Sequence, residues 1–70
     1  MNVNYEIKEE FGTISSEKGY ETKVVSASWN GGPVRYEIRK FSQEGDPFKG
    51  IRLKEQEMRE IKEILNKMFK

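Results

Sequence analysis

The chain has 70 residues, of which 13 are lysine or arginine and 12 are aspartate or glutamate, and it contains no cysteine and no histidine. Disulfides are therefore excluded, and the usual nitrogen and sulfur ligands of structural zinc are missing. A single domain over residues 1–70 has room for a core worth only about 3–5 kcal/mol, so we expect it to gain stability by pairing with a second copy.

The first residues lack the basic and apolar segments of a secretory signal, and no apolar run approaches the roughly 18 residues of a membrane span. We therefore expect a cytoplasmic protein. Residues 18–53 carry seven basic and four acidic side chains, whereas residues 1–17 carry one basic and four acidic. A polyanion is expected to meet the middle of the chain, where aromatic residues also gather.

The first two strands can be placed from the hydrophobic pattern. Residues 4–15, NYEIKEEFGTIS, begin with alternating apolar and polar side chains and lose this phase near Gly12, which predicts a strand with a bulge or bend there. After the turn SSEKG, residues 20–29 are rich in the β-branched and aromatic types that favour strands. Asn30 and Gly31 then predict a hairpin.

The length of the hairpin loop decides which side chains share a face, because a shift of one residue exchanges the two faces of a strand. A loop of two or four residues puts Val25 on an apolar face, whereas a loop of three sets it against charged residues, so we expect an even loop. The apolar face then holds Val25, Ala27, Val34, Tyr36 and Ile38. The opposite, arginine-rich face holds Tyr20, Thr22, Val24, Ser26, Ser28, Arg35, Glu37, Arg39 and Phe41.

The rest of the chain predicts one more strand and a helix. KGIRL at residues 49–53 is typical of a short strand, in which Gly50 permits the close approach of another backbone. Residues 54–70 carry apolar side chains at helical spacing, over a stripe about 140° wide. An apolar stripe about 100° wide is enough to cover one sheet, so the additional width of this stripe predicts a contact with a second subunit. The residues expected in this contact are Met58, Ile61, Leu65 and Met68. The predicted fold is α+β, with four strands and one helix that covers one face.

The arginine-rich face has the residue types that bind a single-stranded nucleic acid. Tyr20 and Phe41 offer rings for stacking on unpaired bases, and Phe41 is expected to point away from the core. The cations available to phosphates are Lys23, Arg35, Arg39, Lys40, Lys49 and Arg52. A solvated sheet face that simply alternates charged and apolar residues would show the same pattern. Two roles also stay open for Trp29, which either closes the end of the core or projects from the hairpin tip to stack on a base.

The sequence lacks the side chains of common catalytic sites. Without histidine or cysteine there is no general base or thiolate of the usual kinds, and no glycine-rich phosphate-binding motif is present. Carboxylate pairs such as Glu9 with Glu10 and Glu44 with Asp46 occur in polar stretches that offer no burial to shift a pKa. We therefore expect a protein that is not an enzyme and that needs no metal or cofactor.

The segment KVVSASWNGGPVRYEIRKF, followed by a polar loop, KGIRL and an amphipathic helix, resembles a known family. It is similar to the single-stranded-DNA-binding domain of the transcriptional coactivator positive cofactor four, and more closely to the small bacterial YdbC-like branch of that fold, which is related to the plant Whirly proteins. The resemblance covers about residues 5–69. It implies a curved four-stranded antiparallel sheet, dimerised through its helices, with DNA across the open face. It also implies that Trp29 stacks on a base, that Arg39 and Lys49 contact phosphates, and that Phe41 belongs to an aromatic pair.

These observations lead to the hypothesis of a homodimer that binds single-stranded DNA with little sequence preference. Such a protein would support transcription or DNA maintenance at the bacterial nucleoid, with transcription or replication proteins as partners. One alternative is a protein-interaction module that recruits a partner through its sheet edge or its helix. RNA is the other alternative ligand, because nothing in the sequence distinguishes the two nucleic acids.

Overall fold

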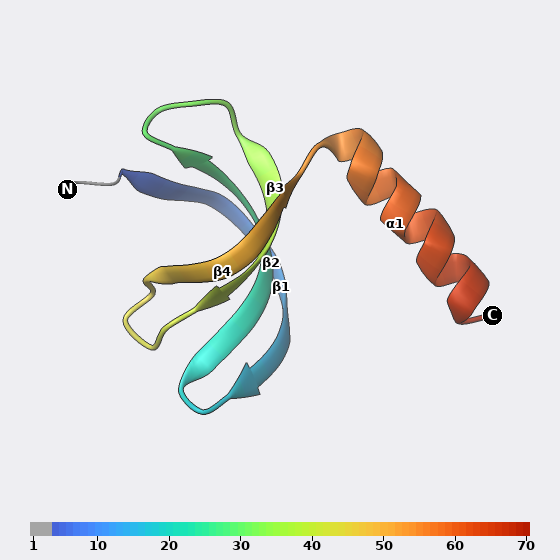
Figure 1. The fold of residues 1–70 in the computed structure, drawn as a ribbon, viewed down its shortest axis with the longest axis horizontal. Coiled ribbons are helices and arrows are strands. Elements are labelled where there is room, and N and C mark those ends of the chain that lie inside the picture. Colours follow the sequence, from blue (N-terminus) through green and yellow to red (C-terminus); the bar gives the residue numbers. More distant parts are fainter. Residues whose placement is uncertain (1–3) are drawn as a thin grey trace.

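The computed structural model describes residues 4–70 and confirms the α+β fold, with an open four-stranded antiparallel sheet followed by one C-terminal helix (Figure 1). The strands lie in the order β1-β2-β3-β4, so each strand neighbours the next one in the sequence. The elements are β1 (Tyr5–Glu17), β2 (Tyr20–Trp29), β3 (Arg35–Phe41), β4 (Pro47–Leu53) and α1 (Glu55–Met68).

The two hairpins on either side of β2 differ in width. Lys18 and Gly19 form a tight turn between β1 and β2, and their φ angles of 51° and 83° are of the kind that a type I′ turn requires. Asn30 also has a positive φ, 52°, but its N–H donates to the carbonyl oxygen of Asn4 at 2.6 Å. Asn30 and Gly31 still form the predicted tight turn, in which the N–H of Gly32 donates to the carbonyl oxygen of Trp29 at 2.9 Å, but residues 32–34 separate this turn from β3, which begins at Arg35.

The register between β2 and β3 differs from the prediction. Val25 lies opposite Glu37, and Ala27 lies opposite Arg35. The expected even loop is therefore wrong, and Val25 shares a face with Glu37 instead of with Tyr36. The prediction assumed that charged side chains face solvent, whereas Glu37 turns to the core side because side-chain donors meet it there.

The sheet is strongly curved. Tyr5 pairs with Trp29 at one end of β2 and Phe41 pairs with Glu21 near the other end, a span of roughly 26 Å if the strand were straight. The ring centroids of Tyr5 and Phe41 are nevertheless only 6.2 Å apart, so this face is concave. The strand ends splay away from the helix in Figure 1. One of the register shifts in β1 ends at Gly12, which confirms the predicted bulge.

The apolar core lies on the concave face and is small. Val25 and Ala27 are fully buried, and they form one cluster with Phe41. Tyr5 and Ile7 of β1 pack against this cluster. Across residues 4–70 the only other buried hydrophobic side chain is that of Leu53.

The helix does not cover the sheet of its own chain, contrary to the prediction. Among the described residues, α1 contacts only β3 and β4, and none of its side chains is buried. Met58 and Ile61 near its start are half-buried, whereas Leu65 and Met68 are 45% and 62% exposed. The helix extends beyond the convex side of the sheet (Figure 1). The apolar stripe that the sequence predicts is therefore left without a partner within one chain.

Gly50 lies opposite Arg39 at a place where a side chain does not fit. A Cβ on residue 50 would lie 2.7 Å from the Cβ of Arg39 and 2.9 Å from its Cα, which agrees with the predicted close approach. We expect Gly50→Ala to lower the free energy of unfolding in urea by about 1–3 kcal/mol. Gly12→Ala is the matched control, because its Cβ would meet nothing within 4 Å. Equal effects of the two substitutions would contradict this reading.

Candidate functional site

The concave face is organised around the carboxylate of Glu37, which is 0% exposed. Its Oε1 accepts hydrogen bonds from the Tyr5 hydroxyl at 2.8 Å and from Arg39 Nε at 2.6 Å. Its Oε2 accepts one from Trp29 Nε1 at 2.8 Å, and Arg52 Nε lies 3.4 Å from the same oxygen. The buried negative charge is therefore met by donors from β1, β2 and β4 as well as from its own strand.

These contacts shift two ionisation equilibria in opposite directions. Burial alone would raise the pKa of Glu37, but hydrogen bonds from Arg39, Trp29 and Tyr5 outweigh it, and the pKa of Glu37 is lowered. Burial raises the pKa of Tyr5, and its hydrogen bond to the Glu37 carboxylate raises it further. The folded state therefore favours a charged Glu37 beside a neutral Tyr5.

Trp29 is half-buried and is held on several sides. Its ring packs against Tyr5, with centroids 4.4 Å apart and planes tilted by 50°. The guanidinium carbon of Arg39 lies 5.2 Å from the indole centroid, within the range of a cation–π contact. Next to the indole is a hollow of about 290 Å³, whose lining includes Arg35 and Arg52. Trp29 thus closes one end of the core and keeps part of its surface in contact with solvent.

Three of the six cations predicted to bind phosphates are engaged within the protein itself. Arg39 Nη1 donates to the carbonyl oxygen of Phe48 at 2.6 Å, in addition to its bond with Glu37. Arg52 Nη2 donates to the carbonyl oxygen of Pro33 at 3.1 Å. Lys23 pairs with Glu10 at 2.8 Å and with Glu21 at 3.7 Å.

Arg35 and Lys49 differ from these three cations. Within residues 4–70 neither of them forms an ion pair, and Arg35 donates only to the carbonyl oxygen of Val34, at 3.2 Å. Their positive charges are therefore open to a ligand.

The predicted position of Phe41 is wrong. Its side chain is 3% exposed and belongs to the core cluster, because the register places it on the concave face. Tyr20 lies at the same end of the sheet but on the other face, and 37% of it is exposed. The structure therefore brings together Trp29, Arg39 and Arg52, but it separates them from Tyr20.

Sequence reasoning missed Glu37 and Tyr5 as parts of this site. One signal was present, since Glu37 and Arg39 are two residues apart in a strand and so share a face. A buried acid beside a cation on the same face is the arrangement that an ion pair requires. The donors from Tyr5 and Trp29 come from other strands, and only the correct register brings them within reach.

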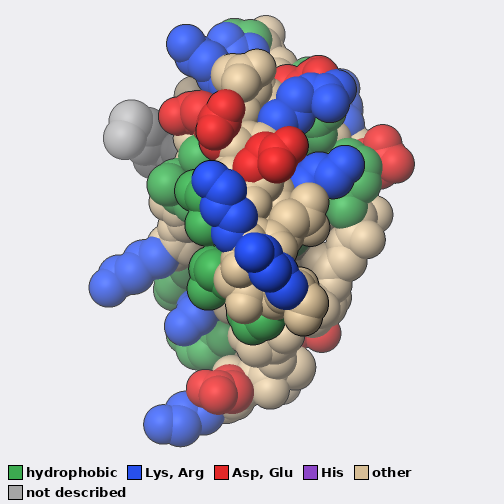
Figure 2. Space-filling model, turned by 90° about the vertical axis from the view of Figure 1, so that its right-hand side faces the viewer, with side chains coloured by type: hydrophobic (Ala, Val, Ile, Leu, Met, Phe, Trp, Pro, Cys, Tyr) green, Lys and Arg blue, Asp and Glu red, His purple; other side chains and the backbone are tan. Residues whose placement is uncertain are grey.

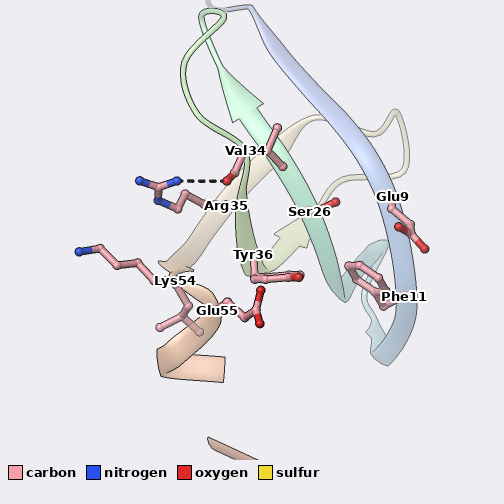
Figure 3. A pocket seen from close by; sticks show the side chains of 9 residues that line it. Glu9, Phe11, Ser26, Val34, Arg35, Tyr36, Lys54 and Glu55 are labelled. Atoms are coloured by element: carbon pink, nitrogen blue, oxygen red, sulfur yellow. Dashed lines mark hydrogen bonds between the residues drawn. The ribbon is translucent and has the colours of Figure 1, made fainter. Parts of the chain in front are cut away.

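A separate groove lies on the convex face of the sheet, where the helix begins. It is a groove of about 500 Å³ whose lining includes Phe11, Tyr36 and Leu53. Figure 3 shows Phe11 of β1 and Tyr36 of β3 on either side of Ser26. From the helix side, Figure 2 shows hydrophobic side chains gathered among basic and acidic ones. The groove and the helix stripe together leave this side of the chain partly apolar.

The described residues contain no cluster of three or more acidic side chains that could hold a metal ion. No helix within residues 4–70 is long and apolar enough to cross a membrane. The candidate site is built from aromatic rings and cations around one buried carboxylate.

Comparison with known proteins gives a relative that matches most of the chain. No protein-family model matches the chain. An uncharacterized protein of Treponema pallidum (strain Nichols) is 36% identical to it over an alignment of 69 residues, which covers 96% of this chain and 81% of that protein. The chain belongs to the family of this Treponema protein. Because the relative is itself uncharacterized, the function has to be argued from the site.

The pairing of Tyr5 with Glu37 predicts a loss of stability at alkaline pH. Above pH 10 the unfolded chain ionises this tyrosine, with an ordinary pKa of about 10, while the folded protein keeps Tyr5 protonated. The unfolded state then binds fewer protons, so the free energy of unfolding falls as pH rises. Tyr5→Phe should make this fall shallower by up to about 1.4 kcal/mol per pH unit, measured by urea unfolding between pH 8 and pH 11.

The control for this experiment is Tyr20→Phe, which removes an exposed hydroxyl without touching Glu37. It should keep the pH dependence of the wild type. At neutral pH we expect Tyr5→Phe to be about 1.5–3 kcal/mol less stable, because it removes a hydrogen bond to a charged acceptor. If both variants kept the wild-type slope above pH 10, the proposed link between Tyr5 and Glu37 would be wrong.

Proposed function

We propose that the protein is a homodimer that binds single-stranded DNA with little sequence preference, on a fold of the positive cofactor four type. The observation that carries the proposal is that the Trp29 side chain is held in place while part of it stays accessible. The hydrogen bond to Glu37 fixes the indole in one orientation beside the hollow of about 290 Å³. A ring that is already ordered loses little entropy when a base stacks on it, and such stacking is worth about 1–3 kcal/mol per base.

The phosphate contacts of this proposal come mainly from unpaired cations. Arg35 and Lys54 line the hollow beside Trp29, and neither forms an ion pair within residues 4–70. Lys49, which lies outside this hollow near the start of β4, is a further cation without an ion pair among the described residues. Arg39 acts indirectly, because it is bound to Glu37 and lies over the indole. The buried cluster thus serves to orient the ring, and the neighbouring cations attract the DNA backbone.

Dimerisation is supported by the unpaired apolar surface of α1. A helix with an apolar stripe and no buried side chain gains little stability from its own chain, since most helical stability in proteins comes from packing. A second copy supplies a surface of the same kind, so two stripes can bury each other around a two-fold axis. The residues proposed for this contact are Met58, Ile61, Leu65 and Met68.

The same helix stripe favours a second candidate function, namely recruitment of another protein through α1. Leu65 and Met68 would then be anchors for a different chain instead of for a second copy. Binding through such a contact depends weakly on salt, whereas phosphate contacts release counterions and depend on it strongly. Salt dependence therefore separates the two functions. RNA in place of DNA is an outcome of the same measurements, made with oligo-U.

Binding of oligo-dT should quench the fluorescence of Trp29, the single tryptophan of the chain. We expect a titration at several salt concentrations to show log affinity falling with log salt by about 0.7 for each phosphate contact. A duplex of equal length should bind more weakly, because its bases are already stacked. No binding of any single strand at low salt would contradict the proposed function. Binding seen by anisotropy without quenching would place the strand away from Trp29.

The mass in solution should be twice the 8.2 kDa of one chain. Leu65→Lys puts a charge into the apolar stripe, and we expect it to shift the protein to a monomer in sedimentation experiments. Asn66→Lys adds the same charge at the next position, outside the stripe, and should leave the dimer intact. A monomeric wild type, or dimers of both variants with equal affinity, would show that α1 does not form the interface.

A further inference from the structure

Two exposed aromatic rings lie at the end of the sheet opposite Trp29. Tyr20 and Phe48 are 37% and 46% exposed, and their ring centroids are 5.1 Å apart in an edge-to-face arrangement of 77°. Tyr20 and Trp29 are the first and last residues of β2, whose pairing with β3 has no register shift, so their side chains lie on opposite faces. The pair of rings is therefore separate from the hollow beside Trp29.

The backbone fixes the position of both rings. Tyr20 directly follows the turn formed by Lys18 and Gly19. Phe48 lies where the register of β3 with β4 shifts, between the pairs of Arg39 and Phe41. A bulge of this kind redirects side chains and is common near functional sites. The carbonyl oxygen of Phe48 also accepts the bond from buried Arg39, so the backbone that carries this exposed ring is bound by the same arginine that contacts Trp29.

Unpaired lysines surround these rings. Lys40 Nζ is 5.9 Å from the centroid of Tyr20, and Lys18 and Lys40 line a hollow of about 270 Å³ together with Tyr20. Glu17 is the single carboxylate in that lining. Within the described part of the chain, Lys18, Lys40 and Lys49 form no ion pair. This end of the sheet thus combines π-faces with open positive charges, which is the composition of a surface for single-stranded nucleic acid.

We propose that Tyr20 and Phe48, together with Lys18 and Lys40, form a second base-stacking subsite for a single strand. The inference rests on the proposed function and extends it, since it provides the stacking surface that buried Phe41 does not offer. A strand long enough to pass around the end of the sheet contacts both Trp29 and this subsite, whereas a short strand occupies one of them.

The test uses full-length protein and oligo-dT of about 4 and about 16 nucleotides, which span the usual site sizes of single-strand binding folds. Binding is followed by the anisotropy of labelled oligonucleotide and by Trp29 quenching. We expect Phe48→Ala to weaken binding of the long strand about fivefold or more, while the short strand quenches Trp29 as in the wild type. Lys40→Ala should reduce the salt slope for the long strand by about 0.7.

The matched controls are Ile14→Ala, which shortens a 61% exposed side chain in β1, and Lys62→Ala on the helix. Both should bind the long strand as the wild type does. If the wild type binds the long strand and Phe48→Ala and Lys40→Ala bind it equally well, the second subsite is wrong while the proposed function stands. If Phe48→Ala changes the mass in solution but not DNA binding, the rings are a protein contact and the inference fails. If the wild type binds no single strand, both proposals fail.

Discussion

The fold depends on one buried carboxylate. Glu37 is surrounded by donors from Tyr5, Trp29, Arg39 and Arg52, so its contacts tie all four strands together on the concave face. The apolar core beside it is small, and this network adds side-chain contacts to the backbone pairing that joins the strands. A buried ion pair by itself is weak evidence of stability, but removing one partner leaves an uncompensated charge. The network therefore favours the observed register, in which side chains of all four strands meet at Glu37.

This arrangement separates two kinds of cation that look alike in the sequence. Cations of the first kind form ion pairs within the protein; they are Lys23, Arg39 and Arg52. The second kind forms no ion pair within residues 4–70 and includes Lys18, Arg35, Lys40 and Lys49. In the account given above, the first group orients aromatic rings and the second group attracts phosphates. A cation's value for binding thus depends on what it already contacts.

The sequence predicted the order of the elements because each one has a local cause. Alternation, the Asn-Gly turn, the bulge at Gly12 and the close approach at Gly50 all follow from a few neighbouring residues. The predicted register was wrong because the register depends on Glu37, whose partners are distant in the sequence. As a result, Phe41 was predicted on the wrong face. Of the candidate site, the sequence predicted Trp29 and Arg39 as binding residues but placed them on opposite faces, and the carboxylate that brings them together was missed. The apolar stripe of the helix was recognised, but its few contacts with the sheet were not foreseen, because the pattern shows which helix face is apolar and not what that face packs against.

The most direct test of this account follows the indole N–H of Trp29 by NMR while oligo-dT is added to ¹⁵N-labelled protein. If Glu37 holds the ring for stacking, the indole resonance should shift as the strand binds and should stay protected from exchange with solvent, because the hydrogen bond persists in the complex. A resonance that is unmoved at saturation would show that bases do not stack on Trp29. A resonance that loses protection would show that binding breaks the Glu37 contact on which the account depends.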